Sequence, residues 1–183
     1  MAEAQEGKND EPTSDKPRMF GGQLEPARLP WKWAVARLTE ARNYWIATTR
    51  PNGQPHCRPV WGVWLENVLY FSTGSLAAQH LTTNPAITVH LESGNEVIIL
   101  EGQADLPRDR LLLERVGRLY HEKYGWQVEM TNDPEPFYAV RPHVAFGWLS
   151  DPSGLDGGSA FHGTATRWRF ASTQADEDRE TAG

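Results

Sequence analysis

A polar tetrapeptide, Ser72-Thr73-Gly74-Ser75, precedes the short apolar run from Leu76 to Leu81. Serine at position 75 is a favourable N-cap, because its side-chain oxygen accepts a hydrogen bond from the first helical turn. The helix would present unpaired backbone N–H groups, and the positive end of its dipole, at the end of the preceding strand. These residues therefore predict a seat for an anion.

Beyond this seat, the sequence holds few groupings of residues that conduct chemistry. Its six histidines are scattered singly, and its acidic residues concentrate in the tails and on helix faces. A hydrolase or metal enzyme would need a nucleophile beside a base, or carboxylates and histidines at metal-ligand spacing. Glycine-rich nucleotide motifs and HExxH are absent as well. We therefore predict no metal site, leave the catalytic residues unassigned, and interpret Cys57 as a small strand residue.

The anion seat follows a segment with the pattern of an antiparallel meander. Asn52-Gly53 predicts a type I′ hairpin turn, since both residues tolerate positive φ. The flanking runs Trp45–Thr49 and His56–Leu65 are rich in β-branched and aromatic residues, which favour strands. Glu66-Asn67 turns the chain into a third strand, Val68–Thr73. The resulting sheet would end at the anion seat.

The same periodicity rules predict the other elements. They are helices over 30–43 and 109–124, strands over 87–91, 96–104, 137–149 and 164–170, and a loop over 151–159. Pro142 indicates an edge strand or a bulge. Short turns between antiparallel strands favour closure into a barrel, which hides strand edges. We predict a mainly β fold, a six- or seven-stranded antiparallel split β-barrel with flanking helices.

Length and charge limit the organisation and the partners of the chain. A chain of 183 residues is of a size for one domain, and eight tryptophans suit a large core or interface. Of the net charge of −6, most lies at the two ends, so we expect disordered acidic tails over 1–22 and 171–183 around a domain at 23–170. The body has no basic stripe and no long apolar run. We expect no nucleic-acid or membrane partner and a cytoplasmic location.

Four motifs, in the order of these elements, resemble a known family. They are WIATTRPNGQPHCRPVWGVW, LYFSTGS before a short helix, VIILEGQA and TATRWRF. From Leu29 to Phe170 the chain resembles the pyridoxamine 5′-phosphate oxidase-like flavin-binding split barrels, including their deazaflavin (coenzyme F-420) relatives. The resemblance implies FMN or coenzyme F-420 as cofactor and a homodimer with cofactor sites at the subunit interface.

The resemblance also implies where the cofactor would bind. The strand Arg58–Gly62 would run beside the ring, with Arg58 matching an arginine that contacts phosphate in the oxidase branch. The cofactor-binding positions so implied are Arg58, Pro59, Val60, Trp61, Gly62, Ser72, Thr73, Ser75, Gln79, His80 and Trp168.

Two positions depart from the family pattern. Leu76 and Ala77 stand where the family usually has a basic pair that holds the phosphate. The absence of each charge-assisted hydrogen bond to the phosphate weakens binding by roughly 1.5–3 kcal/mol. A C-terminal arginine-histidine substrate motif of the oxidase branch is also missing, which argues against oxidation of pyridoxamine phosphate itself.

Three functions remain open at this point. A tryptophan-rich barrel beside an anion seat suits a flat ring with an anionic tail, so we expect an oxidoreductase that transfers hydride to or from a small conjugated or heteroaromatic substrate. The alternative is a non-catalytic binding or carrier module for flavin, haem or tetrapyrrole. The third is a dimeric scaffold whose ligand seat has decayed at Leu76 and Ala77.

Overall fold

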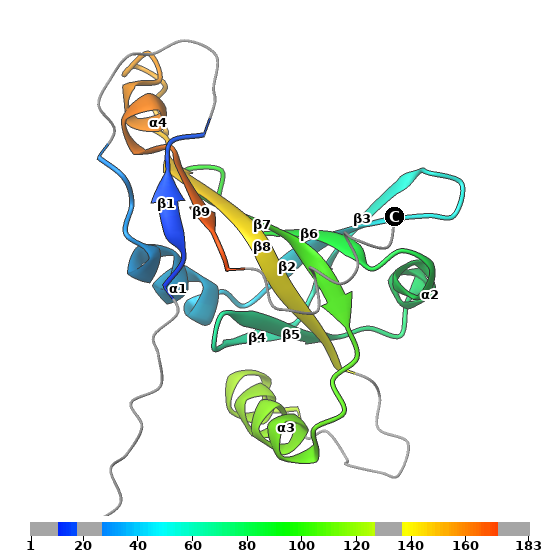
Figure 1. The fold of residues 1–183 in the computed structure, drawn as a ribbon. Helices are drawn as coiled ribbons and strands as arrows, with labels where there is room; N and C mark the ends of the chain where they lie inside the picture. Colours follow the sequence, from blue (N-terminus) through cyan, green and yellow to red (C-terminus); the bar gives the residue numbers. More distant parts are fainter. Residues whose placement is uncertain (1–10, 18–26, 127–136, 172–183) are drawn as a thin grey trace, which may run out of the picture.

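The fold is known from a computed structural model, which describes residues 11–17, 27–126 and 137–171 (Figure 1). These residues form nine strands and four helices. In chain order they are β1 (Thr13–Asp15), α1 (Trp31–Glu40), β2 (Tyr44–Thr49), β3 (Pro55–Val60), β4 (Gly62–Leu65), β5 (Val68–Ser72), α2 (Leu76–Thr83), β6 (Ala86–His90), β7 (Glu96–Asp105), α3 (Arg110–Tyr124), β8 (Phe137–Leu149), α4 (Ser159–Thr164) and β9 (Thr166–Arg169).

All the described strands belong to one antiparallel sheet that branches at β8. The main order is β1-β9-β8-β7-β6-β2-β3, while β5 pairs with both β4 and the first residues of β8. Within the described strands no ladder joins β3 to β4, which are successive pieces of one segment. The barrel is therefore split where the chain passes from β3 to β4. The prediction of a mainly β split barrel with flanking helices is confirmed, with more strands than expected.

The first hairpin forms where predicted, but with a different turn. Of Asn52-Gly53 only Gly53 has positive φ, +83°, and its N–H donates to the carbonyl of Arg50 at 2.8 Å. The turn with two residues of positive φ lies one hairpin later, at Glu66 (53°) and Asn67 (60°). The predicted type I′ geometry at Asn52-Gly53 is therefore wrong, because a longer loop closes this hairpin with one left-handed residue.

The predicted strand His56–Leu65 is broken at Trp61, between β3 and β4. The next residue, Gly62, sits so close to the neighbouring strand that a Cβ would lie 2.9 Å from Leu69 Cδ1 and 2.9 Å from the carbonyl oxygen of Tyr70. Glycine alone fits this approach. The break redirects the chain from one edge of the sheet to the other.

Three helices agree with their sequence signals. Ser75 Oγ caps α2 by accepting from the Ala77 N–H, and Asp109 caps α3 by accepting from two backbone N–H groups. Gly125 ends α3 in the left-handed conformation, with φ 69°. The helix α4 was not predicted: it fills the gap between the predicted loop, which ended at Ser159, and the predicted strand, which began at Thr164.

The long strand β8 is central, which corrects one of the two predictions for Pro142. It pairs with β7 along one side, and with β5 and β9 along the other, so it is not an edge strand. The predicted bulge is confirmed, since the β7–β8 register shifts between Glu101 and Gly102, opposite Pro142.

The strand β1 lies inside the segment for which disorder was predicted. Thr13–Asp15 pair with Arg167–Arg169 of β9, and the Asp15 carboxylate accepts from the Arg167 guanidinium at 2.6 and 2.5 Å. The prediction of disorder fails for these three residues, because their partner lies some 150 residues away and no local pattern signals it. Residues 1–10, 18–26 and 172–183 lie outside the described part.

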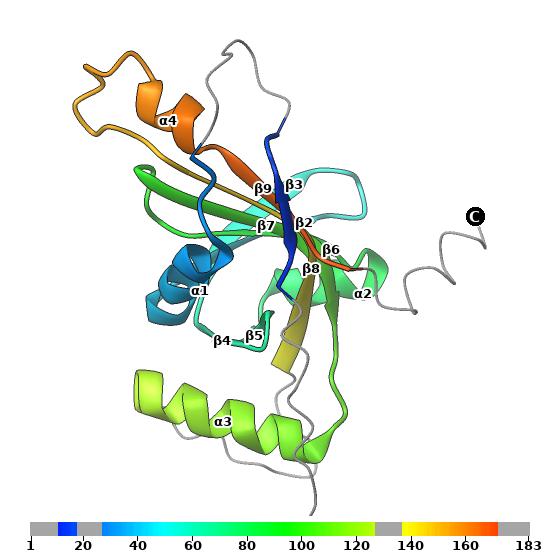
Figure 2. The same ribbon diagram turned by 60° about the vertical axis from the view of Figure 1, so that its left-hand side comes forward.

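The core has two parts, on opposite sides of β4 and β5. Inside the barrel, the Trp31 ring of α1 makes edge-on contacts with Trp64, Trp168 and Phe170, at centroid distances of 6.2, 5.3 and 5.1 Å. On the outer side α3 forms a separate layer (Figure 2). The second cluster comprises Val63, Val68, Tyr70, Val116, Tyr120, Phe137 and Ala139. The sheet between α1 and α3 is thus covered on both faces.

The bulge yields a prediction about Gly102. A Cβ there would lie 2.2 Å from the carbonyl oxygen of Arg141, so Gly102→Ala should lower the free energy of unfolding by about 2–4 kcal/mol. In the matched control Gly117→Ala, within α3, a Cβ would meet nothing within 4 Å, and stability should rise by about 0.5–1 kcal/mol. Urea unfolding of both variants measures this. If both variants changed the free energy of unfolding equally, the close contact between Gly102 and Arg141 would be contradicted.

Candidate functional site

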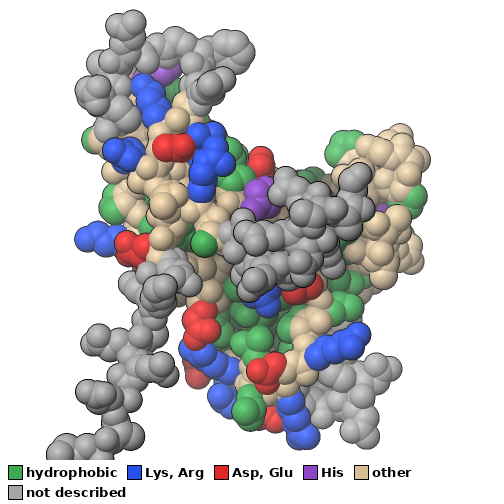
Figure 3. Space-filling model, in the orientation of Figure 1, with side chains coloured by type: hydrophobic (Ala, Val, Ile, Leu, Met, Phe, Trp, Pro, Cys, Tyr) green, Lys and Arg blue, Asp and Glu red, His purple; other side chains and the backbone are tan. Residues whose placement is uncertain are grey.

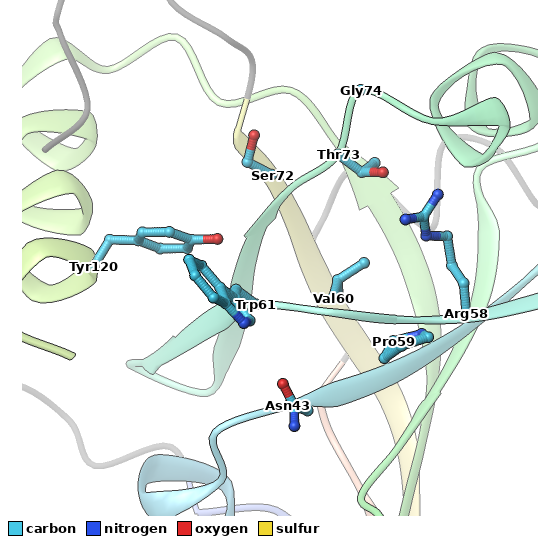
Figure 4. A pocket seen from close by; sticks show the side chains of 9 residues that line it. All are labelled: Asn43, Arg58, Pro59, Val60, Trp61, Ser72, Thr73, Gly74 and Tyr120. Carbon is cyan, nitrogen blue, oxygen red and sulfur yellow. The ribbon is translucent and has the colours of Figure 1, made fainter. Parts of the chain in front are cut away.

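A pocket of about 350 Å³ opens at the split of the barrel (Figure 4). Its lining comes from the α1–β2 turn, β3, the β3–β4 break, the end of β5 and α3. The residues are Asn43, Arg58, Pro59, Val60, Trp61, Ser72, Thr73, Gly74 and Tyr120. Arg58 extends from β3 toward Thr73 and the loop at Gly74, whereas Trp61 and Tyr120 lie at the other end. One end of the pocket is cationic and the other aromatic.

The Arg58 side chain has no anionic partner among the described residues. Its Nε is covered from solvent yet has no hydrogen-bond partner, and Arg58 makes no ion pair with a described carboxylate. A covered donor on a charged group is costly to leave unpaired. The cationic end of the pocket therefore suits an anionic ligand that accepts from the guanidinium.

The start of α2 adds neutral donors to this end. Thr73 Oγ1 lies 2.8 Å from Ser75 Oγ, and Ser75 Oγ accepts from the Ala77 N–H at 3.2 Å. Ala77 is fully buried, so no basic side chain would fit there without disruption, whereas Leu76 is 53% exposed. The start of α2 therefore carries hydroxyl groups and backbone N–H groups but no basic side chain.

The structure gathers six of the eleven predicted site residues. Those that line the pocket are Arg58, Pro59, Val60, Trp61, Ser72 and Thr73. Those that lie outside the lining are Gly62, Ser75, Gln79, His80 and Trp168. Ser75 is one residue beyond it, as the cap of α2, and Gln79 is exposed on α2.

Three of these five have other roles in the fold. Gly62 bonds through its N–H and C=O to α3, so its backbone is engaged away from the pocket. His80 is 5% exposed rather than on the surface, and its Nδ1 lies 3.0 Å from Thr48 Oγ1. Trp168 is 1% exposed within the barrel core.

Three lining residues were not predicted from the sequence: Asn43, Gly74 and Tyr120. Gly74 lies within the predicted polar tetrapeptide, so proximity to Ser75 was a usable signal. Tyr120 lies within the helix predicted over 109–124, to which no site role was assigned, and it belongs to the outer core cluster. Its position beside β3 depends on how α3 docks, which periodicity does not reveal.

The C-terminal turn of α3 holds the β3–β4 break in place. The Gly62 N–H donates to Tyr124 Oη at 2.9 Å, and Lys123 Nζ donates to the Gly62 carbonyl at 3.1 Å. The Trp61 ring stacks on Tyr124, with centroids 4.7 Å apart and an interplanar angle of 5°. Lys123 also donates to Tyr44 Oη at 3.0 Å. These contacts fix the aromatic wall of the pocket.

Lys123 is partly buried and makes no ion pair with a described carboxylate. Burial lowers the pKa of its ammonium to about 8, with a smaller contribution from the positive charge of Arg42. Its donors go to the Gly62 carbonyl, to Tyr44 Oη and to the carbonyl of Thr39. A substantial fraction of the folded chains therefore carries a neutral Lys123 at mildly alkaline pH.

Fold and site together define a split β-barrel with a pocket of cofactor size at its split. The chain belongs to the pyridoxamine 5′-phosphate oxidase family, whose sequence model matches residues 32–170. No curated protein matches the chain.

Solved structures share the fold at low sequence identity. A candidate pyridoxamine 5′-phosphate oxidase from Listeria innocua has a TM-score of 0.54 and 17% identity, covering 65% of this chain and 98% of its own. An FAD-binding protein from Mesorhizobium loti has a TM-score of 0.52 and 15% identity, covering 78% and 96%. General stress protein 26 from Bacillus anthracis has a TM-score of 0.51 and 20% identity, covering 62% and 88%.

The partly buried Lys123 yields a prediction about pH. Its ammonium has a pKa of about 8 in the fold against 10.5 for the free side chain, so between these values the unfolded chain binds more protons. Stability should therefore rise with pH from about 8 to about 10, and Lys123→Met should abolish the rise. Denaturant unfolding at several pH values measures it, with exposed Lys32→Met as control. A rise that persists in Lys123→Met would contradict the assignment.

Proposed function

We propose that the chain is an FMN- or coenzyme F-420-binding oxidoreductase. The reaction is hydride transfer to or from a small conjugated or heteroaromatic substrate. Belonging to the pyridoxamine 5′-phosphate oxidase family supports a flavin-type ligand, and the polarity of the pocket supports an elongated one, anionic at one end and flat at the other.

The observation that carries the proposal is Arg58 in the pocket without a described anionic partner. A phosphate or a similar oxyanion would accept from its guanidinium in a charge-assisted hydrogen bond. Ser72 and Thr73 line the same end and offer hydroxyl donors. These residues fit the phosphate-bearing arm of either cofactor.

The other end fits a planar ring. Trp61 and Tyr120 provide aromatic surfaces, and Val60 is buried in the wall between the two ends. Among the described strands β3 pairs with β2 alone, so one backbone edge of β3 is open to hydrogen bonds from a ring. The bound ring supplies the hydride chemistry, while these residues orient it and exclude water.

We also propose that the chain forms a homodimer. Most of the exposed large apolar side chains of the described residues lie near the pocket or in and next to α3: Trp61, Leu76, Leu106, Leu111 and Trp126; Leu155, before α4, is exposed as well. Hydrophobic side chains gather between α3 and the strands above it, bordered by charged ones (Figure 3). An apolar centre with a polar rim is typical of a protein–protein interface.

A non-catalytic carrier of flavin, haem or tetrapyrrole is the second candidate. It is favoured by the pocket lining, in which Arg58 and Tyr120 are the only ionisable described residues. Neither is a general acid or base suited to neutral pH. Such a lining would hold a ring without having to turn over a substrate.

Titration with each ring cofactor, followed by turnover, tests the proposal. FMN or coenzyme F-420 should bind with quenched ring fluorescence, and the reduced cofactor should be oxidised by a conjugated acceptor faster than without protein. Binding without turnover of any acceptor would favour the carrier. If neither cofactor binds, the proposed oxidoreductase is wrong. Light scattering on the same sample tests the homodimer.

Arg58 gives a sharper test of the anionic end. Arg58→Gln should weaken FMN binding by about 10- to 100-fold, because one charge-assisted hydrogen bond is worth roughly 1.5–3 kcal/mol. Riboflavin, which lacks the phosphate, should bind almost equally to both forms. Fluorescence titration measures all four affinities, with Arg115→Gln, an exposed partner of Glu66, as control. Equal loss for both ligands would place the phosphate elsewhere.

A further inference from the structure

A row of side chains on the inner face of β3 leads from the pocket toward α2. Strand alternation places His56, Arg58 and Val60 on this face, and all three are at least half-buried, whereas Cys57 and Pro59 between them are exposed. Arg58 and Val60 line the pocket. His56 is therefore the next side chain beyond Arg58 on the face that carries the proposed anion site.

A second histidine covers His56 from α2. His80 is 5% exposed, and its ring meets the His56 ring edge-on, with centroids 5.0 Å apart and an interplanar angle of 82°. His80 Nδ1 lies 3.0 Å from Thr48 Oγ1, so this hydrogen bond to β2 fixes the ring. The pair thus joins β3, α2 and β2 beside the cationic end of the pocket.

Two covered nitrogen atoms on this face lack partners among the described residues. They are His56 Nδ1 and Arg58 Nε, two positions apart on one strand. A covered polar atom without a partner costs stability, and these two differ from the other such atoms, Arg37 Nε and Trp168 Nε1, in lying on one strand beside the pocket, where a bound ligand could pair with them.

The charged groups that act on His56 are all basic. They are His80 on α2, Arg50 after β2 and Arg58 on β3 itself. Burial, and then these positive neighbours, lower the pKa of the His56 imidazole below its usual value. An anion placed against Arg58 would offset this repulsion and favour the protonated ring.

We infer that His56 is a second, protonatable cation of the anion site, which takes up a proton when an oxyanion binds at Arg58. The identity of the natural ligand rests on the proposed function. The anion site itself rests on the two covered nitrogen atoms and the basic groups around them. When protonated, His56 supplies part of the positive charge that a basic pair at positions 76 and 77 would supply and that Leu76 and Ala77 lack. The chain therefore holds oxyanions more tightly at mildly acidic than at alkaline pH.

Nuclear magnetic resonance titration of the His56 ring, with inorganic sulfate as probe, tests this. Sulfate keeps its double charge across the pH range of histidine titration, so any change belongs to the protein. In sulfate His56 should titrate about one pH unit higher than in chloride of equal ionic strength, which corresponds to sulfate binding about tenfold tighter below the titration than above it. His56→Gln identifies the signal and should remove the pH dependence of sulfate affinity.

Two further variants test whether the sulfate-induced shift depends on the anion site. Arg58→Gln should abolish the sulfate-induced shift, and His143→Gln, at an exposed position of β8, should leave it unchanged. Identical His56 titrations in sulfate and chloride would overturn the inference, yet FMN binding would still support the proposed function. A shift in sulfate, with no binding of FMN or coenzyme F-420, would keep the proton-linked site and refute the proposed cofactor.

Discussion

The structure depends on one close approach, that of Gly62 to β5. A Cβ there would lie only 2.9 Å from the carbonyl oxygen of Tyr70, so only glycine lets the chain pass this close to β5 just after the break at Trp61. The segment serves two edges of the sheet, as β3 and then as β4, and the barrel splits between them. The pocket lies at this split, and α3 secures it through Lys123 and Tyr124. The close approach of Gly62, the split of the barrel and the wall of the candidate site thus lie together at one point of the chain.

The proposed anion site has its positive charge on β3 rather than at the start of α2. The position after the α2 cap is exposed and apolar in Leu76, and the next, Ala77, is fully buried, so the helix start supplies N–H groups without positive side chains. Cations enter instead from β3, through Arg58 and, when protonated, His56. If the proposed site holds an oxyanion, its affinity would be set largely by one strand and would respond to pH.

The sequence predicts what local rules determine. Caps at Ser75 and Asp109, the glycine stop of α3 and the long strand β8 all have short-range signals, and all are present. The break at Trp61 was missed because Gly62 is required by a neighbouring strand, and β1 because its partner β9 is distant in sequence. The same holds for the pocket. Its residues from β3 and β5 were predicted from sequence motifs, whereas Tyr120 reaches the pocket only because of how α3 packs.

Several unfavourable features of the molecule lie on or beside the segment that passes from β3 to β4. Arg58 Nε and His56 Nδ1 are covered without described partners, Lys123 is partly buried without an ion pair to a described carboxylate, and Trp61 is 40% exposed. Each costs stability, and a sequence selected for stability alone would spread or remove such costs. Two other covered nitrogen atoms without a described partner, Arg37 Nε and Trp168 Nε1, lie elsewhere, but those on β3 adjoin a pocket, where a ligand could offset what the free chain leaves unpaired. The decayed-scaffold alternative predicts the reverse, since a seat without a ligand would lose its buried charges to apolar residues.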